Sequence, residues 1–136
     1  MVFSGAFAKK SMLLAAMLAG SFVGGMAFKA YSDSGPASAP LSYIADPQTY
    51  HLLKENDQFR VIMAKRPPGH KDAWHSHSAL ALYSLTDCQG HLFSADGKVI
   101  DVKSKAGTVI LNPATPSHTA DNTGTTECDQ LIVERK

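Results

Sequence analysis

The sequence lacks the charged runs and nucleotide-binding motifs that would indicate a function directly. Charged residues make up 18% of the chain, and 13 lysines and arginines nearly balance 12 aspartates and glutamates. Because no basic run is present to follow a phosphate backbone, we expect no nucleic-acid partner. The ten glycines show neither a G-x-G-x-x-G nor a P-loop spacing, so nothing supports nucleotide binding. A chain of 136 residues that is 44% hydrophobic is instead typical of one globular domain.

The first 30 residues have the composition of an export signal. Lys9 and Lys10 precede an uncharged stretch over residues 11–28, and the small residues of Gly25-Met26-Ala27 fit a cleavage site. We therefore predict a signal peptide or membrane anchor over residues 1–27. Cleavage would place the protein in the periplasm or in the medium, and without cleavage the stretch 11–28 would be its only membrane attachment. A mis-assigned start codon is the remaining alternative.

The rest of the chain divides by composition into a linker and a folded part. Residues 28–47 are rich in Ser, Pro, Gly and Ala and are predicted to be a flexible linker. Residues 48–136 contain short apolar runs separated by turn signals, among them the strong hairpin signal Asp96-Gly97. This pattern predicts an all-β sandwich or barrel.

The histidines contain the clearest chemical signal. His75 and His77 stand two residues apart, so on a strand both imidazoles point to the same face and could chelate one metal ion. His118 follows a separate turn, Asn112-Pro113-Ala114-Thr115-Pro116, so a third imidazole could come from another strand.

Two spaced motifs surround these histidines. Gly69, with five residues between, precedes the H-x-H pair, and Gly107, Pro113, His118 and Asn122 follow the pattern G-x5-P-x4-H-x3-N. Over roughly residues 50–135 the chain thus resembles the cupin superfamily, whose second motif has a glycine where Thr115 stands here. The resemblance implies a small antiparallel jelly-roll barrel with His75, His77 and His118 as metal ligands.

The chain departs from the family pattern at one metal ligand. The glutamate of the first motif should fall at Ala81 or Leu82, and neither side chain can bind a metal. Three neutral imidazoles can still hold one divalent transition metal ion, Fe, Zn, Ni or Cu, with open positions for a ligand. Tyr83 has the parity of position 81, so we predict that Tyr83 and Thr115 line the substrate pocket.

Further expectations depend on the jelly-roll resemblance. In that fold the strand over 80–86 ends near the start of the strand over 128–134, which predicts a Cys88–Cys128 disulfide in an exported protein. Small cupins commonly pair through their sheets, so we also expect a homodimer.

The favoured interpretation is an exported small cupin that binds one divalent metal ion and acts on a small organic molecule. The sequence identifies no catalytic residue and leaves dioxygenase-type and isomerase-type chemistry unresolved. The alternative is a module that binds a small ligand or a metal ion without turnover. A third interpretation is a structural β-domain with a vestigial pocket.

Overall fold

The computed structural model describes residues 34–136, so the predicted signal peptide over residues 1–27 lies outside the described part of the chain. Within residues 34–136, no helix is long and apolar enough to cross a membrane. These residues form one short helix, α1 (Ser42–Ala45), and nine strands. The strands are β1 (Tyr50–Glu55), β2 (Phe59–Arg66), β3 (His75–His77), β4 (Leu80–Ser84), β5 (Cys88–Ser94), β6 (Val99–Ser104), β7 (Val109–Asn112), β8 (Thr115–Ala120) and β9 (Cys128–Arg135).

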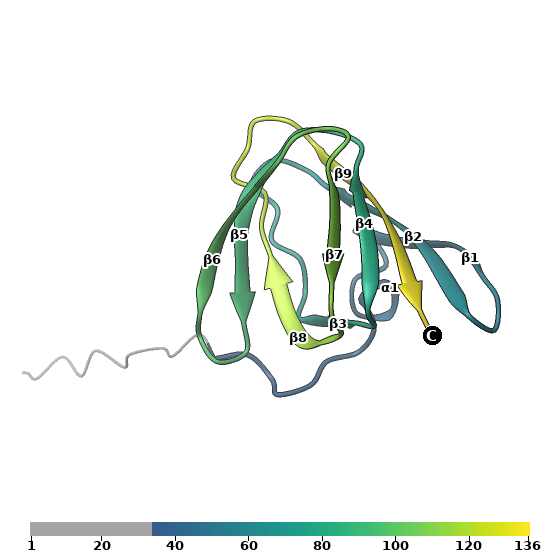
Figure 1. Cartoon of the computed structure of the whole chain (residues 1–136). Helices are drawn as coiled ribbons and strands as arrows, with labels where there is room; N and C mark the ends of the chain where they lie inside the picture. Colours follow the sequence, from purple (N-terminus) through teal and green to yellow (C-terminus); the bar gives the residue numbers. More distant parts are fainter. Residues whose placement is uncertain (1–33) are drawn as a thin grey trace, which may run out of the picture. The chain divides into compact units, whose positions relative to one another are not determined.

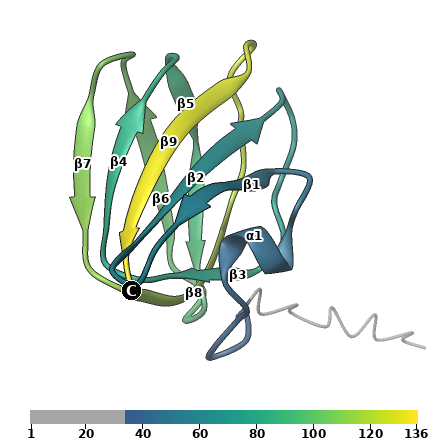
Figure 2. The same cartoon turned by 90° about the vertical axis from the view of Figure 1, so that its right-hand side faces the viewer.

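The strands form two sheets that face each other as a jelly roll (Figure 1). One sheet has the order β1-β2-β9-β4-β7 and the other the order β3-β8-β5-β6. Figure 2 shows the five strands of the first sheet side by side, with the second sheet behind them. Every pair of named strands runs antiparallel. The predicted fold class, a small antiparallel jelly-roll barrel, is confirmed.

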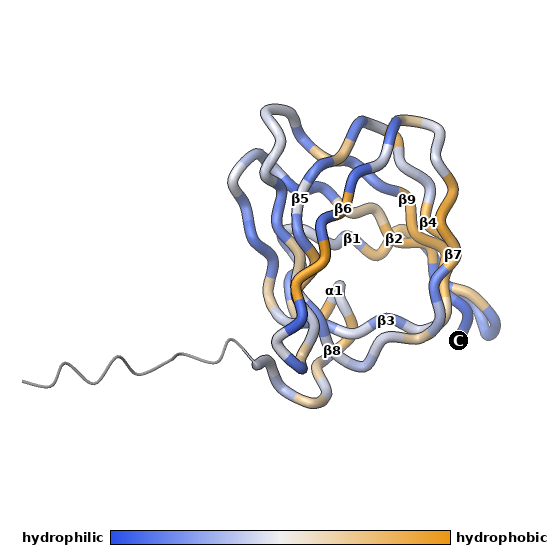
Figure 3. Tube along the Cα trace, turned by 60° about the vertical axis from the view of Figure 1, so that its left-hand side comes forward, coloured by the Kyte–Doolittle hydropathy of each residue, from blue (hydrophilic) through white to orange (hydrophobic). Residues whose placement is uncertain are grey.

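Alternation along the five-stranded sheet separates an inner from an outer face. The core between the sheets contains Ile62 of β2, Leu80 of β4 and Ile132 of β9, together with Tyr50 and Ala64. The outer face of the same strands also has apolar side chains. Figure 3 shows hydrophobic stretches along β2, β9, β4 and β7, and a further one along β6 of the other sheet. The exposed side chains of this outer face include Tyr83, Val109 and Leu111, the last of them 76% exposed.

A disulfide joins Cys88 at the start of β5 to Cys128 at the start of β9. The antiparallel pairing of β4 with β9, in register at Ser84 and Gln130, brings the end of one strand to the start of the other. The predicted pairing is confirmed, and the bond closes a loop with a sequence separation of 40 residues.

Part of the segment predicted as a linker contacts the barrel. The amide of Ala39 donates a hydrogen bond to Pro116 O at 3.0 Å, and the amide of Ser76 donates to Pro40 O at 2.8 Å. Gly35 passes so close to the indole of Trp74 that a Cβ at this position would lie 2.3 Å from the ring, so only glycine fits there. Residues 35–40 therefore lie against the strand that carries the H-x-H pair. The domain boundary at residues 47 and 48 stays a prediction.

Candidate metal centre

The pairing of β3 with β8 brings the three predicted ligands together. His75 pairs with His118 and His77 with Thr115, so the three imidazoles meet on the inner face of the four-stranded sheet. His75 is fully buried, and His77 and His118 are 7% and 8% exposed. One nitrogen from each ring lies within 4.8 Å of the others, and no other such group of three is found among residues 34–136.

Hydrogen bonds fix the tautomers of two of these rings. Nδ1 of His75 donates to Ala73 O at 2.8 Å. Nδ1 of His77 donates to Glu134 Oε1 at 2.5 Å. A carbonyl oxygen and a carboxylate can only accept, so each Nδ1 carries a proton. In both rings this leaves Nε2 as the nitrogen that can bind a metal ion.

The two Nε2 atoms face each other at 3.1 Å. One ion placed beside this pair would contact both nitrogens. A metal ion about 2.0–2.1 Å from each nitrogen would set them about 2.9–3.4 Å apart for angles between octahedral and tetrahedral. The third ring is compatible with the same role, because Nδ1 of His118 is buried without a hydrogen-bond partner. The donor chemistry of these three residues therefore fits a metal ion, and the His75–His77 pair already stands at a chelating distance.

Burial lowers the pKa of two of these imidazoles. Desolvation, with the neighbouring His77 adding to it, lowers the pKa of His75 to about 4, although the nearby Asp72 opposes the shift. Desolvation, followed by the charges of His75 and His77, lowers the pKa of His118 to about 2. Both imidazoles are neutral near pH 7, which is the form that binds metal ions.

A buried carboxylate lies behind one ligand. The side chain of Glu134 is 0% exposed, and its Oε2 lies 3.5 Å from Nη1 of Arg60. A carboxylate that accepts from the far nitrogen of a ligating histidine orients the ring and raises its basicity. Sequence reasoning missed Glu134. The available signal was its parity with Ile132, which is buried two residues earlier on the same strand.

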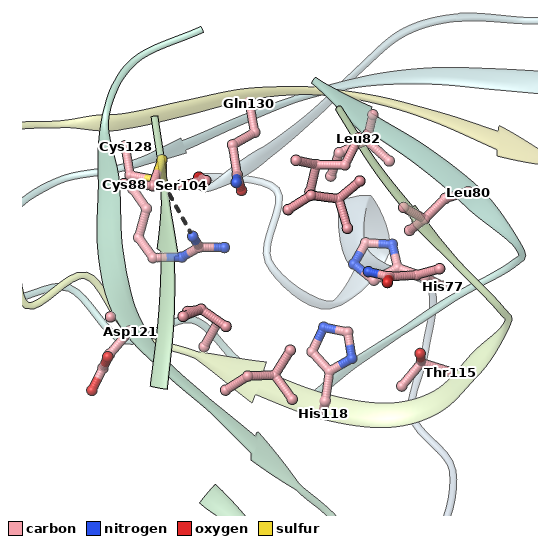
Figure 4. A pocket seen from close by; sticks show the side chains of 18 of the residues that line it. His77, Leu80, Leu82, Cys88, Ser104, Thr115, His118, Asp121, Cys128 and Gln130 are labelled. Carbon is pink, nitrogen blue, oxygen red and sulfur yellow. Dashed lines mark hydrogen bonds between the residues drawn. A yellow bond between two sulfur atoms is a disulfide. The ribbon is translucent and has the colours of Figure 1, made fainter. Parts of the chain in front are cut away.

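A cavity of about 480 Å³ extends from the histidines into the barrel. Figure 4 shows His77, His118 and Thr115 at one end and the Cys88–Cys128 disulfide at the other. Apolar side chains of both sheets line the space between the two ends: Leu80, Leu82, Leu92, Val102, Ile110 and Ile132. The volume lies within the range of about 300–1,000 Å³ that is typical of small-molecule sites.

Comparison with known proteins identifies the fold. No protein-family profile matches the chain, and no curated protein matches it. A cupin domain from Bordetella pertussis Tohama I superposes with a TM-score of 0.59 at 20% identity, over 75% of this chain and 99% of that one. An RmlC-like cupin family protein from Methanocaldococcus jannaschii, described as a double-stranded β-helix, gives a TM-score of 0.52 at 15% identity, over 63% and 77% of the two chains.

The chain has the cupin fold. At this level of identity the likeness establishes architecture and no activity, so the chemistry of the site depends on the residues of this chain.

An apolar side chain, Leu82, lies in the cavity at one of the two positions where the cupin motif would have its glutamate. Of the two candidate positions, Leu82 lines the cavity, and Ala81 faces the other side of β4. Thr115 lines the cavity as predicted. Tyr83 does not: it is 44% exposed on the outer face, so its prediction as a pocket residue is corrected. The physical reason is the alternation of β4, which points Leu80 and Leu82 inward and residues 81 and 83 outward.

A buried ionic cluster also borders the cavity. Nη2 of Arg66 donates to the Tyr50 hydroxyl at 2.7 Å and to Asp72 Oδ2 at 3.0 Å. The Tyr50 hydroxyl donates to the same Asp72 oxygen at 2.7 Å. The other oxygen of Asp72 lies 3.6 Å from Nδ1 of His75, so the cluster reaches the metal ligands. No sequence pattern predicts this cluster, because its members come from separate strands and loops.

Proposed function

We propose that this protein is an exported cupin that holds one divalent transition metal ion through His75, His77 and His118 and acts on a small organic molecule in the adjoining cavity. The observation that carries the proposal is the pair of Nε2 atoms 3.1 Å apart, on two rings whose Nδ1 atoms each donate a hydrogen bond. Two imidazole nitrogens held in this way can bind one metal ion together.

A metal ion and the surrounding side chains would have separate roles at this site. A bound ion of this class supplies Lewis-acid activation or, in the case of iron, dioxygen chemistry. Three neutral imidazoles leave its positive charge uncompensated, which favours a ligand that offers an anionic or carbonyl oxygen. The leucines and isoleucines that line the cavity hold an apolar body and exclude water from it.

A binding role without turnover is the second candidate, and one observation favours it. Among the described residues that line the cavity, no free interior carboxylate is available as a general base. Asp121 accepts a hydrogen bond from the amide of His91 at 2.7 Å, and the side chain of Asp101 is 95% exposed. Leu82 stands where the cupin motif has its glutamate.

The proposed location outside the cytoplasm is supported by the Cys88–Cys128 disulfide, since such bonds persist in oxidising compartments. The predicted signal over residues 1–27 stays a prediction.

Elemental analysis of exported, untagged protein tests the metal site. We expect one equivalent of one transition metal in the wild type and in the control His51→Ala, whose side chain is exposed on β1. The metal should be absent in His75→Ala and His118→Ala. A wild-type protein without metal, even after anaerobic reloading, would overturn the proposal.

Incubation of the metal-loaded protein with dicarbonyls, thiols and sugar acids then separates the two candidate functions. Turnover that vanishes in His118→Ala supports an enzyme. Binding without turnover throughout the panel supports the second candidate.

A further inference from the structure

The end of the cavity opposite the histidines contains a buried cation with unused donors. The side chain of Arg66 is only 8% exposed. Its Nε and Nη2 are occupied by Asp72 and Tyr50, at 2.7–3.2 Å. Nη1 has one contact, Cys128 Sγ at 3.9 Å, marked by the dashed line in Figure 4. Sulfur is a weak acceptor, so the two Nη1 hydrogens lack a strong partner in a place where unpaired donors are costly.

The charge of Arg66 is only partly balanced by Asp72. The Asp72 carboxylate also accepts from the Ala120 amide at 2.7 Å. This donor and the Tyr50 hydroxyl share the negative charge. The guanidinium therefore keeps attraction for a second anion at Nη1, and a planar carboxylate matches its geometry.

A second donor lies at the same end. Gln130 of β9 lines the cavity, and Figure 4 shows its amide pointing into the open space near the disulfide. No hydrogen bond joins this amide to another residue of the described part of the chain, although an amide has two donor hydrogens to satisfy. Gln130 and Arg66 thus offer N–H groups to the same end of the cavity.

We infer that this end is a carboxylate-binding subsite, and that the molecule bound in the cavity is a small organic acid. Its carboxylate would accept from Nη1 of Arg66 and the amide of Gln130, its apolar body would lie between the leucines, and an oxygen at its far end would face the three histidines. The inference deepens the proposed function, because it names the chemical class of the ligand of the same cavity.

Calorimetric titration of Zn²⁺-loaded protein with matched probes tests this subsite. The probes are straight-chain ω-hydroxyalkanoates of increasing length and the corresponding ω-hydroxyalkanamides, which are neutral and have an NH2 group in place of one carboxylate oxygen. Since hydrogen bonds to a charged acceptor are roughly twice as strong as those to a neutral one, we expect the best acid to bind at least about tenfold more tightly than its amide. Equal affinities for acid and amide, or no binding of any acid at millimolar concentration, would overturn the inference.

Two substitutions locate the subsite. Gln130→Leu removes an amide that bonds to nothing in the described fold, and Arg66→Lys keeps a cation beside Asp72 but removes the Nη1 donors. Each should weaken acid binding about tenfold and weaken binding of the neutral amide probes by clearly less. The control Gln48→Leu, at an exposed position away from the cavity, should bind like the wild type. Normal zinc content verifies that each variant is folded.

The same titration separates failure of the subsite from failure of the metal site. If acid affinity is unchanged in Gln130→Leu and Arg66→Lys but lost in His118→Ala, the carboxylate binds at the histidines and the inference is wrong. If the wild type holds no metal and still selects acids through Gln130 and Arg66, the inference stands while the proposed function fails. If metal binds and acids are not selected, only the inference fails.

Discussion

Glu134, the carboxylate hydrogen-bonded to His77, should affect the metal affinity, and the structure indicates by how much. Glu134→Gln keeps the shape of the side chain and an acceptor oxygen 2.5 Å from Nδ1 of His77, but removes the negative charge. A hydrogen bond to a charged group contributes about 1.5–3 kcal/mol, about half of which a neutral acceptor retains. Removal of such partners typically weakens metal binding by about 10–100-fold, or about 1.4–2.7 kcal/mol. We expect the smaller end of this range for Glu134→Gln and the larger end for Glu134→Leu.

Glu134→Gln should change the free energy of unfolding of the metal-free protein much less than it changes the metal affinity. Oε2 of Glu134 is buried without a hydrogen-bond partner, so its desolvation already offsets part of its attraction to Arg60. Arg60 keeps Glu55 at 3.4 Å after the change. We therefore expect the free energy of unfolding to change by about 1 kcal/mol or less.

Competition titration of Zn²⁺ against a chromophoric chelator measures the first effect, and urea denaturation of metal-free protein measures the second. Glu127→Gln, an exposed carboxylate beside Lys65, is the matched control and should change neither. Unchanged zinc affinity in a folded Glu134→Gln protein would refute the assignment of Glu134 as a positioning residue for His77. A large loss of stability with unchanged affinity would instead identify it as a structural charge.

Three further predictions concern the rest of the domain. Replacing Cys88 and Cys128 together by alanine should lower the free energy of unfolding by up to roughly 4 kcal/mol in urea denaturation, because the bond closes a loop with a sequence separation of 40 residues. The hydrogen bond to Asp121 raises the pKa of His91. The stability that this pair contributes should therefore be fully present below the unfolded-state pKa of histidine and be lost as pH rises through the folded-state pKa. NMR titration should show that Asp121→Asn lowers the pKa of His91. The expected homodimer stays a prediction, and we propose the apolar outer face of the five-stranded sheet as its contact, so Leu111→Lys should give a monomer in sedimentation velocity runs where the wild type is a dimer.

The metal ligands could be predicted because their signal is local. Two histidines two residues apart share a face of any strand, whatever the rest of the chain does. The second motif added His118, and the register of β3 with β8 brings it opposite His75. The disulfide was predictable for a related reason, since the jelly-roll order of strands alone places Cys88 near Cys128.

The residues that surround the ligands could not be predicted in this way. Whether Glu134 contacts His77 depends on which face of β9 is buried and on its distance across the barrel, and neither is encoded near His77. Arg66 stands at the end of β2, where an arginine is normally a solvent-exposed residue. The prediction for Tyr83 was wrong because alternation was counted from position 81, whereas β4 points residues 80 and 82 inward.

Asp72 stands between Arg66 and the metal ligands, so a change to either group affects the other. One oxygen accepts from Arg66 and Tyr50, and the other lies 3.6 Å from Nδ1 of His75. The charge of this carboxylate therefore acts on the guanidinium and on a metal ligand at once. Because the core cluster of the barrel is small, little apolar burial is available to stabilise this polar interior. The disulfide beside Arg66 therefore stabilises both the fold and the proposed anion-binding end of the cavity, because it joins the starts of β5 and β9 at that end.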